Sequence, residues 1–412
     1  MEIFKRTNFD FLGRKWPFIL LSLLLTVAGL ISLWMKGGPK YGIDFTGGAL
    51  MDVNFIKRPP AESIRAALRH KITGEIEVQE IGNTQEVLIS TGARDDNALQ
   101  VVRGDMISTL NTAFNPGQAG QAAGKFDINL TSQSALADRL REPLTRGGVM
   151  LSDDQLQAIT KAITNFRDTP PRSGLISSLD DLAGVPGVTA PFLKVLKDEC
   201  FAGNFAIRSV ETVGPRIGAD LRQQAINVVL IALGAMLVYI AFRFEWKYGV
   251  AAVIAVFHDT IITIGLFSLL NKQIDLTVIA ALLTLVGYSM NDTIVTFDRI
   301  RENLRLHVRG TFPSIVNLSI NQTLSRTVLT SGLTFLTALS LFLFGGQVLN
   351  GFSLALVIGI IIGTYSSIFI ASPILVFWHN VAAGKAGQTK ATAVEVRPAG
   401  TGKGAKTAKT VK

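Results

Sequence analysis

Cysteine, histidine and charged residues are all scarce in this sequence. The single cysteine, Cys200, has no partner for an intramolecular disulfide, so a domain outside the cytoplasm must rely on an ordinary apolar core. The four histidines are dispersed without forming a cluster of metal ligands, and no Walker-type glycine loop for phosphate occurs. These absences argue against a metal-dependent, ATP-driven or hydrolytic enzyme. We predict that the chain is not an enzyme and has no cofactor.

Hydrophobic residues are abundant and concentrated in long runs. They make up 48% of the 412 residues, against 17% charged residues. A spanning helix needs about 20 apolar residues, and six runs qualify: residues 16–35, 225–242, 249–270, 276–297, 325–344 and 352–378. The first run is longer than a signal-peptide core and lacks a small-x-small cleavage site, so we interpret it as a retained anchor. The sequence predicts an α-helical polytopic membrane protein with six transmembrane helices.

Basic residues predict the orientation of these helices. They cluster in residues 1–15, in the loop 243–247, in residues 299–309 and in the tail 381–412, which we expect to be disordered. The positive-inside rule places all these segments in the cytoplasm, so residues 36–222 should form a head domain in the periplasm. The formal charge of +9 is then a topology signal of a cell inner-membrane protein and indicates no nucleic-acid partner. Residues 298–309 alternate acids and bases, which favours an interfacial helix.

The predicted head domain has a small core and a large insert. Strands at 49–55, 75–81, 86–90 and 206–212 and helices at 61–70 and 97–114 follow a βαββαβ order, which is that of a ferredoxin-like α+β fold. This core comprises about 41–114 and 205–213. The insert, about 115–204, predicts helices at 132–140 and at 152–166, where Ser152 is a suitable cap. Residues 179–196 weakly resemble a helix-hairpin-helix, for which a structural role is favoured.

Ionisable residues inside the apolar runs are the candidate functional residues, because charge is costly at membrane depth. His258 and Asp259 lie about ten residues into the third run, roughly 15 Å deep at 1.5 Å per residue. Asn291 and Asp292 lie in the fourth run, and Arg326 enters the membrane at the start of the fifth, at the depth of Asp292.

We predict that these five residues form a proton pathway. Because arginine stays charged, Asp292 would be the group that titrates beside Arg326. A static ion pair that holds two helices together is the alternative for Asp292 and Arg326. Asp259 is a second candidate carboxylate, and His258 is either a relay or a structural hydrogen-bonding residue.

Small residues follow one face of the last apolar run at four-residue spacing. They are Gly359, Gly363, Ser367 and Ala371. Small side chains allow two membrane helices to approach closely, so we expect this face to pack against another helix.

Several stretches resemble the SecF branch of the SecD/SecF family of protein-export subunits. The most specific is LTLVGYSMNDTIVTFDRIREN at 283–303. The others are YGIDFTGG at 41–48, VETVGPRIG at 210–218, AFRFEWKYG at 241–249, FHD at 257–259 and FGGQVLNGFS at 344–353. Only the insert at about 115–204 departs from the shorter head domain that is usual in this family.

The resemblance implies a function in protein export across the cytoplasmic membrane. It implies half of an RND-type transporter that works with SecD and uses the proton motive force to help polypeptides leave the SecYEG channel. Further expected partners are YajC, YidC, the translocating polypeptide and membrane lipids. It also implies that Asp292 and Arg326 are the important membrane charges.

Two other functions remain open at this point. One is half of an RND-type exporter of small molecules or lipids, because a fold does not determine its cargo. Such an exporter is expected to carry two six-helix halves and two head domains in one chain, whereas this sequence has one of each. The other is a passive scaffold of the translocon.

Overall fold

The chain divides into two compact units in a computed structural model. The structure describes residues 7–72, 76–81, 84–92, 96–115, 124–243, 245–346 and 348–381. The unit called the head unit comprises Lys40–Leu230 and Gln273–Ile279. The other, called the membrane unit, comprises the remaining described residues. The predicted tail at 381–412 lies, except for residue 381, outside the described residues.

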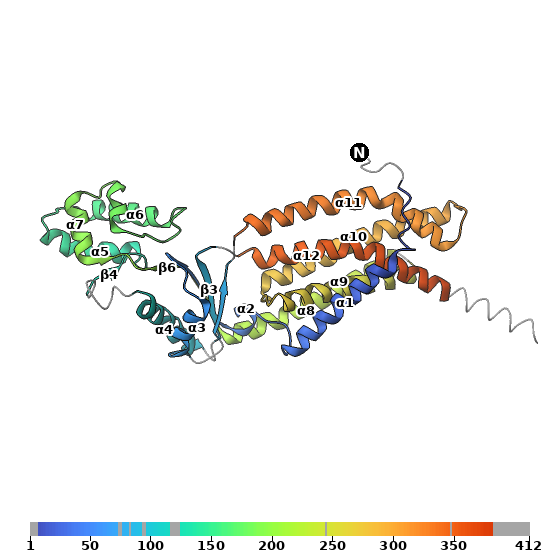
Figure 1. Cartoon of the computed structure of the whole chain (residues 1–412), viewed down its shortest axis with the longest axis horizontal. Helices are drawn as coiled ribbons and strands as arrows, with labels where there is room; N and C mark the ends of the chain where they lie inside the picture. Colours follow the sequence, from blue (N-terminus) through green and yellow to red (C-terminus); the bar gives the residue numbers. More distant parts are fainter. Residues whose placement is uncertain are drawn as a thin grey trace, which may run out of the picture. The chain divides into compact units, whose positions relative to one another are not determined.

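Six helices among the described residues are long and apolar enough to cross a membrane, which confirms that prediction. They are α1 (Lys15–Met35), α8 (Pro215–Arg243), α9 (Trp246–Leu269), α10 (Leu276–Arg305), α11 (Phe312–Phe344) and α12 (Asn350–Ser366) (Figure 1). A π-helical turn, η3 (Ser367–Ala371), continues α12, so that this apolar helix runs on to Val381.

Two of these helices are longer than their apolar runs. α10 continues unbroken to Arg305, so the helix predicted at 298–309 is, over residues 298–305, the end of α10. α11 begins at Phe312, well before residue 325, with a proline in its first turn, where a fixed φ suits the helix. The first turns of α11 are polar, and their side chains bind the N-terminal segment. The Asn317 and Asn321 side-chain oxygens accept hydrogen bonds from backbone N–H groups of that segment at 2.9 and 2.8 Å.

Glycines bring the membrane helices close together. A Cβ atom on Gly29 of α1 would lie 2.7 Å from the Cα of Gly265 on α9. On α12, a Cβ on Gly363 would lie 3.0 Å from the Cβ of Ser289 on α10, and one on Gly359 would clash with Leu285. The predicted packing role is confirmed for Gly359 and Gly363. Close approach also places the polar side chains of α9, α10 and α12 within hydrogen-bonding distance.

A four-stranded antiparallel sheet forms the core of the head unit. Its elements are β1 (Gly48–Phe55), α3 (Ala61–Arg69), β2 (Ile76–Glu80), β3 (Glu86–Thr91), α4 (Asp96–Phe114) and β6 (Phe205–Val213). The strands lie in the order β2-β3-β1-β6. Alternate residues of β1, among them Met51 and Val53, are fully buried with Ile64 and Leu68 of α3 and Leu110 of α4. The helices therefore cover one face of the sheet, and the other face carries the polar residues of β1.

The insert has a hydrophobic core of its own. Its elements are β4 (Phe126–Asp127), α5 (Gln133–Arg146), α6 (Asp153–Asp168), η2 (Leu179–Gly184), α7 (Ala190–Glu199) and β5 (Cys200–Phe201). Leu140, Ile163 and Phe192 meet in this core, and burial there raises the pKa of the Cys200 thiol. Ser152 caps α6 as predicted, because its hydroxyl and the Gln155 side chain form a reciprocal capping box.

Both ends of the insert meet at a polar cluster, called here the insert clasp: Asn115, Asp127, Asn129 and Gly203, which are buried, and Asn204, which is exposed. The Asp127 carboxylate accepts hydrogen bonds from the backbone N–H groups of Asn129 and Gly203 at 2.9 and 3.0 Å. The backbone N–H of Asn204 donates to the Asn115 side chain at 2.6 Å. Burial raises the pKa of Asp127, and the N–H donors oppose this shift. The clasp fixes the entry and exit of the insert side by side.

Candidate functional site

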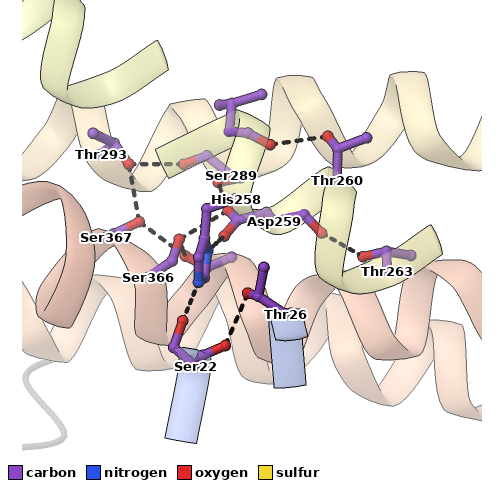
Figure 2. Close-up of polar contacts among 12 residues, drawn as sticks. Ser22, Thr26, His258, Asp259, Thr260, Thr263, Ser289, Thr293, Ser366 and Ser367 are labelled. Carbon is purple, nitrogen blue, oxygen red and sulfur yellow. Dashed lines mark hydrogen bonds and ion pairs between the residues drawn. The ribbon is translucent and has the colours of Figure 1, made fainter. Parts of the chain in front are cut away.

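Asp259 is a carboxylate buried between the membrane helices. It lies on α9 and is 1% exposed. Its Oδ2 accepts hydrogen bonds from the Ser289 hydroxyl on α10 at 2.5 Å and from the Ser366 hydroxyl on α12 at 2.8 Å (Figure 2). Gly363 has no side chain, so α12 can approach α10 at Ser289 closely enough for both serine hydroxyls to reach Asp259. Three helices therefore contribute directly to one carboxylate.

His258 connects this carboxylate to α1. Its Nδ1 lies 2.8 Å from the Asp259 Oδ1, and its Nε2 contacts the hydroxyl of Ser22 (Figure 2). The Tyr365 ring stands edge-on to the imidazole, with ring centroids 6.2 Å apart. A neutral imidazole that donates from Nδ1 to Asp259 would accept from the Ser22 hydroxyl at Nε2. The hydrogen bonds form a continuous chain from Ser22 through His258 and Asp259 to Ser289 and Ser366.

Further hydroxyls lie beside this chain. The Thr293 and Ser367 hydroxyls are 3.0 Å apart, one helical turn from Ser289 on α10 and next to Ser366 on α12 (Figure 2). The Thr293 hydroxyl also lies 3.2 Å from the backbone carbonyl of Ser289. Hydroxyls both donate and accept hydrogen bonds, so they can pass a proton along without carrying a charge themselves.

Asp292, the second buried carboxylate, has a different environment. It lies on α10, is 3% exposed, and accepts a hydrogen bond from the Ser331 hydroxyl of α11 at 2.9 Å. Within the described residues, Asp292 and Arg326 form no ion pair within 4.0 Å, although the positive charge acts on the carboxylate from a longer distance. The expected direct pair is therefore not formed in this structure. Arg326 precedes Ser331 by five residues, which turns the two side chains about 140° apart around α11.

Asn291 on α10 and Arg326 on α11 are both exposed in the isolated chain. Each lies in a helix that is otherwise apolar enough to span a membrane. Lipid chains offer no hydrogen-bond partners, so these polar groups favour a protein surface as their neighbour.

The structure thus separates the five predicted residues into two groups. His258 and Asp259 share one hydrogen-bonded cluster, whereas Asp292, Asn291 and Arg326 form no common cluster in the part of the chain that the structure describes. Four serines of these contacts were not predicted: Ser289, Ser331 and Ser366 bind the carboxylates, and Ser22 contacts His258. Their only signal was a hydroxyl within an apolar run, and most such hydroxyls bond to their own helix.

Comparison with known proteins identifies the family. Residues 194–381 match the family model described as Protein export membrane protein SecD/SecF, C-terminal. The protein translocase subunit SecF of Koribacter versatilis is 49% identical over 391 residues, which cover 92% of this chain and 94% of the relative. SecF of Desulfurispirillum indicum is 36% identical over 364 residues, 88% of each chain. This chain belongs to the SecF family.

Solved structures of SecDF agree with this membership in the SecF family. The crystal structure of SecDF, a translocon-associated membrane protein from Thermus thermophilus, is 31% identical to this chain with a TM-score of 0.61. The match covers 91% of this chain and only 39% of SecDF. SecDF in its super-membrane-facing form matches with a TM-score of 0.54 at 30% identity. SecF proteins are protein translocase subunits, so this chain is an integral membrane component of protein transport.

Proposed function

We propose that this SecF-family subunit uses the proton motive force to promote protein export. The observation that carries the proposal is the burial of two carboxylates, Asp259 and Asp292, among apolar helices, where hydroxyl and imidazole groups bind them. Among the described residues, no basic side chain forms an ion pair with Asp292. A carboxyl group can bind and release a proton, and the hydroxyl groups beside these two carboxyl groups both donate and accept hydrogen bonds. The chain of hydrogen bonds that joins Ser22, His258, Asp259 and Ser366 would relay protons to and from Asp259.

The partner in this proposal is SecD. The exposed polar residues Asn291 and Arg326 require a neighbouring protein surface, and the longer SecDF relative carries sequence beyond the part that matches this chain. Family membership further suggests SecYEG, YajC and YidC as associated proteins and an exported polypeptide as cargo. The basic residues support a chain in the inner membrane with both termini in the cytoplasm and the head unit in the periplasm.

We also propose that the head unit has a ferredoxin-like core. The strand order β2-β3-β1-β6, antiparallel pairing and two helices on one sheet face support this class. The insert would then be an addition to this core.

The decisive experiment is Asp292→Asn in cells that depend on this subunit. Secretion of a preprotein is measured with and without an uncoupler, after membrane insertion and partner association have been verified. The expected result is loss of the uncoupler-sensitive part of secretion. Asp298→Asn is a matched control on the same helix, because the Asp298 side chain is 59% exposed.

Two results would contradict the proposal. Unchanged secretion that remains fully uncoupler-sensitive would exclude a proton role for Asp292. A passive scaffold would also tolerate the substitution. If secretion were intact but a drug or lipid accumulated, an RND-type exporter would be the better assignment.

A further inference from the structure

The loop that joins α9 to α10 is bonded to the start of the head unit. Ile274 and Tyr41 form a parallel β-bridge. The N–H of Ile274 donates to the carbonyl of Lys40 at 2.7 Å, and the N–H of Gly42 donates to the carbonyl of Ile274 at 2.9 Å. The loop therefore behaves locally as an additional strand alongside residues 40–42.

Side chains tie the same loop to the sheet. Glu77 of β2 accepts hydrogen bonds from the Lys40 ammonium at 2.5 Å and from the Gln273 amide. The Gln273 amide also lies 3.4 Å from the hydroxyl of Ser90 on β3. The Glu77 side chain is only 17% exposed, which strengthens these contacts relative to a surface ion pair.

The first residue of α10 is held as well. The short helix α2 (Ile43–Thr46) carries Asp44, and its Oδ2 accepts a hydrogen bond from the N–H of Leu276 at 3.0 Å. The adjacent Gly47 has a φ of +72°, and a Cβ there would lie 2.6 Å from the Cα of Pro215 at the start of α8. The turn before β1 thus touches the first residues of α8 and α10 with little free space.

We propose that residues 40–44, residues 273–276 and Glu77 form a coupling joint that makes the start of α10 move with the β-sheet as one rigid body. Gln273–Ile279, which include the first residues of α10, belong to the head unit although α10 is a membrane helix. Glu77 and Asp44 are positioning residues in this joint. The inference rests on the proposed function, because α10 also carries Asp292. A displacement of α10 on protonation would then reach β1 and β2 instead of being absorbed by a flexible loop.

Cross-linking tests whether the joint stays closed. Tyr41 and Ile274 are bridged neighbours, and the spacing of paired strands, about 4.8 Å, lies within the range that a disulfide spans. In a Tyr41→Cys, Ile274→Cys variant, the native Cys200 is 1% exposed and should react little. Oxidised and reduced samples of this variant are expected to support the same rate of export. If oxidation stops export and reduction restores it, the joint opens during the cycle and the proposal is wrong.

Substitutions that remove contacts of the joint test whether it couples α10 to the β-sheet. Glu77→Ala combined with Asp44→Asn should remove as much uncoupler-sensitive export as Asp292→Asn does, with no additional loss when all three are combined. Glu80→Ala is the matched control, because Glu80 also lies on β2 but pairs with Arg58 at 3.2 Å, away from the loop. Wild-type export by the loosened variant, or additive losses, would refute coupling.

Hydrogen exchange separates this inference from the proposed function. Asp292→Asn should change amide exchange in β1 and β2 when the joint is intact, and should leave it unchanged in the Glu77→Ala, Asp44→Asn background. This comparison stands even if Asp292→Asn does not affect export, in which case only the proposed function fails. An exchange change that persists in the loosened background would overturn the coupling joint itself.

Discussion

Asp259 and Asp292 are both buried carboxylates of the membrane unit, yet their surroundings differ. Asp259 has polar partners on α9, α10 and α12, and His258 extends its contacts to α1. Asp292 has one hydroxyl partner among the described residues, Ser331, on one neighbouring helix. The first site is complete within this chain. The second lies beside helix faces whose exposed polar residues call for another protein.

The difference suggests two roles for two similar residues. A carboxylate with several donors in place is held in one geometry, so Asp259 suits a fixed relay or a structural crossing of helices. A carboxylate with a single neutral donor, near an arginine that has not closed onto it, can change partners. We therefore expect the conformational change to originate at Asp292. We also expect assembly with SecD to alter the surroundings of Asp292 more than those of Asp259.

The largest effect is expected from a substitution that separates α12 from α10 at the Asp259 site. Gly363→Leu introduces a Cβ atom that would lie 3.0 Å from the Cβ of Ser289, so α12 must move away from α10. Overpacking of this kind costs about 1–3 kcal/mol or more, and we expect little monodisperse protein in size-exclusion chromatography. Gly234→Leu on α8 is the control, because no described atom outside its own helix backbone lies within 4 Å of a Cβ at that position. Equal yields of the two variants would contradict the proposed packing.

Truncating the two carboxylates sharpens the comparison. Asp259→Ala leaves the hydroxyls of Ser289 and Ser366 and the His258 imidazole without their acceptor, whereas Asp292→Ala leaves only Ser331. A buried polar group without a partner costs about 1–3 kcal/mol, so Asp259→Ala should lower the apparent Tm in detergent more than Asp292→Ala. The same Tm for both variants would mean that the Asp259 hydrogen bonds contribute no additional stability.

Thiol labelling compares access to the two sites. Arg326→Cys should react readily with a maleimide in the isolated chain, because Arg326 is exposed, and more slowly in the complex with SecD. Ser366→Cys, at a fully buried position beside Asp259, should react poorly in both states. Labelling of position 326 that is unaffected by SecD would place the partner elsewhere.

The smallest expected effect concerns a carboxylate of the head unit, Asp52 on β1. Burial raises its pKa to about 6, and the nearby Arg208 charge only partly opposes this. Between the unfolded value of 3.8 and about 6, the folded state keeps a proton that the unfolded state has released, so stability falls as pH rises through this window. Asp52→Asn should therefore protect the β1 amides from hydrogen exchange at neutral pH and not at acidic pH. A constant difference at all pH values would exclude titration of Asp52 as the cause.

Much of the architecture could be predicted because membranes impose simple rules. Long apolar runs identified six helices, and the rarity of charge inside them singled out Asp259 and Asp292. The actual relation of Asp292 to Arg326 was not predictable, because depth along a helix does not determine the direction in which a side chain points. The early start of α11 was hidden for a related reason. Asn317 and Asn321 make that segment look polar, and only the folded chain shows the backbone groups that they bind.

The insert clasp makes the insert a unit that could be exchanged as a whole. Because Asn115 and Asn204 are hydrogen-bonded to each other, the two ends of the insert leave the sheet core at one point. The intervening residues have their own apolar core, so the region resembles a detachable cassette that could be exchanged without repacking β1 or α3. A graft of this segment onto a SecF protein with a shorter head, or its replacement here by a short linker, would show which export tasks the cassette serves.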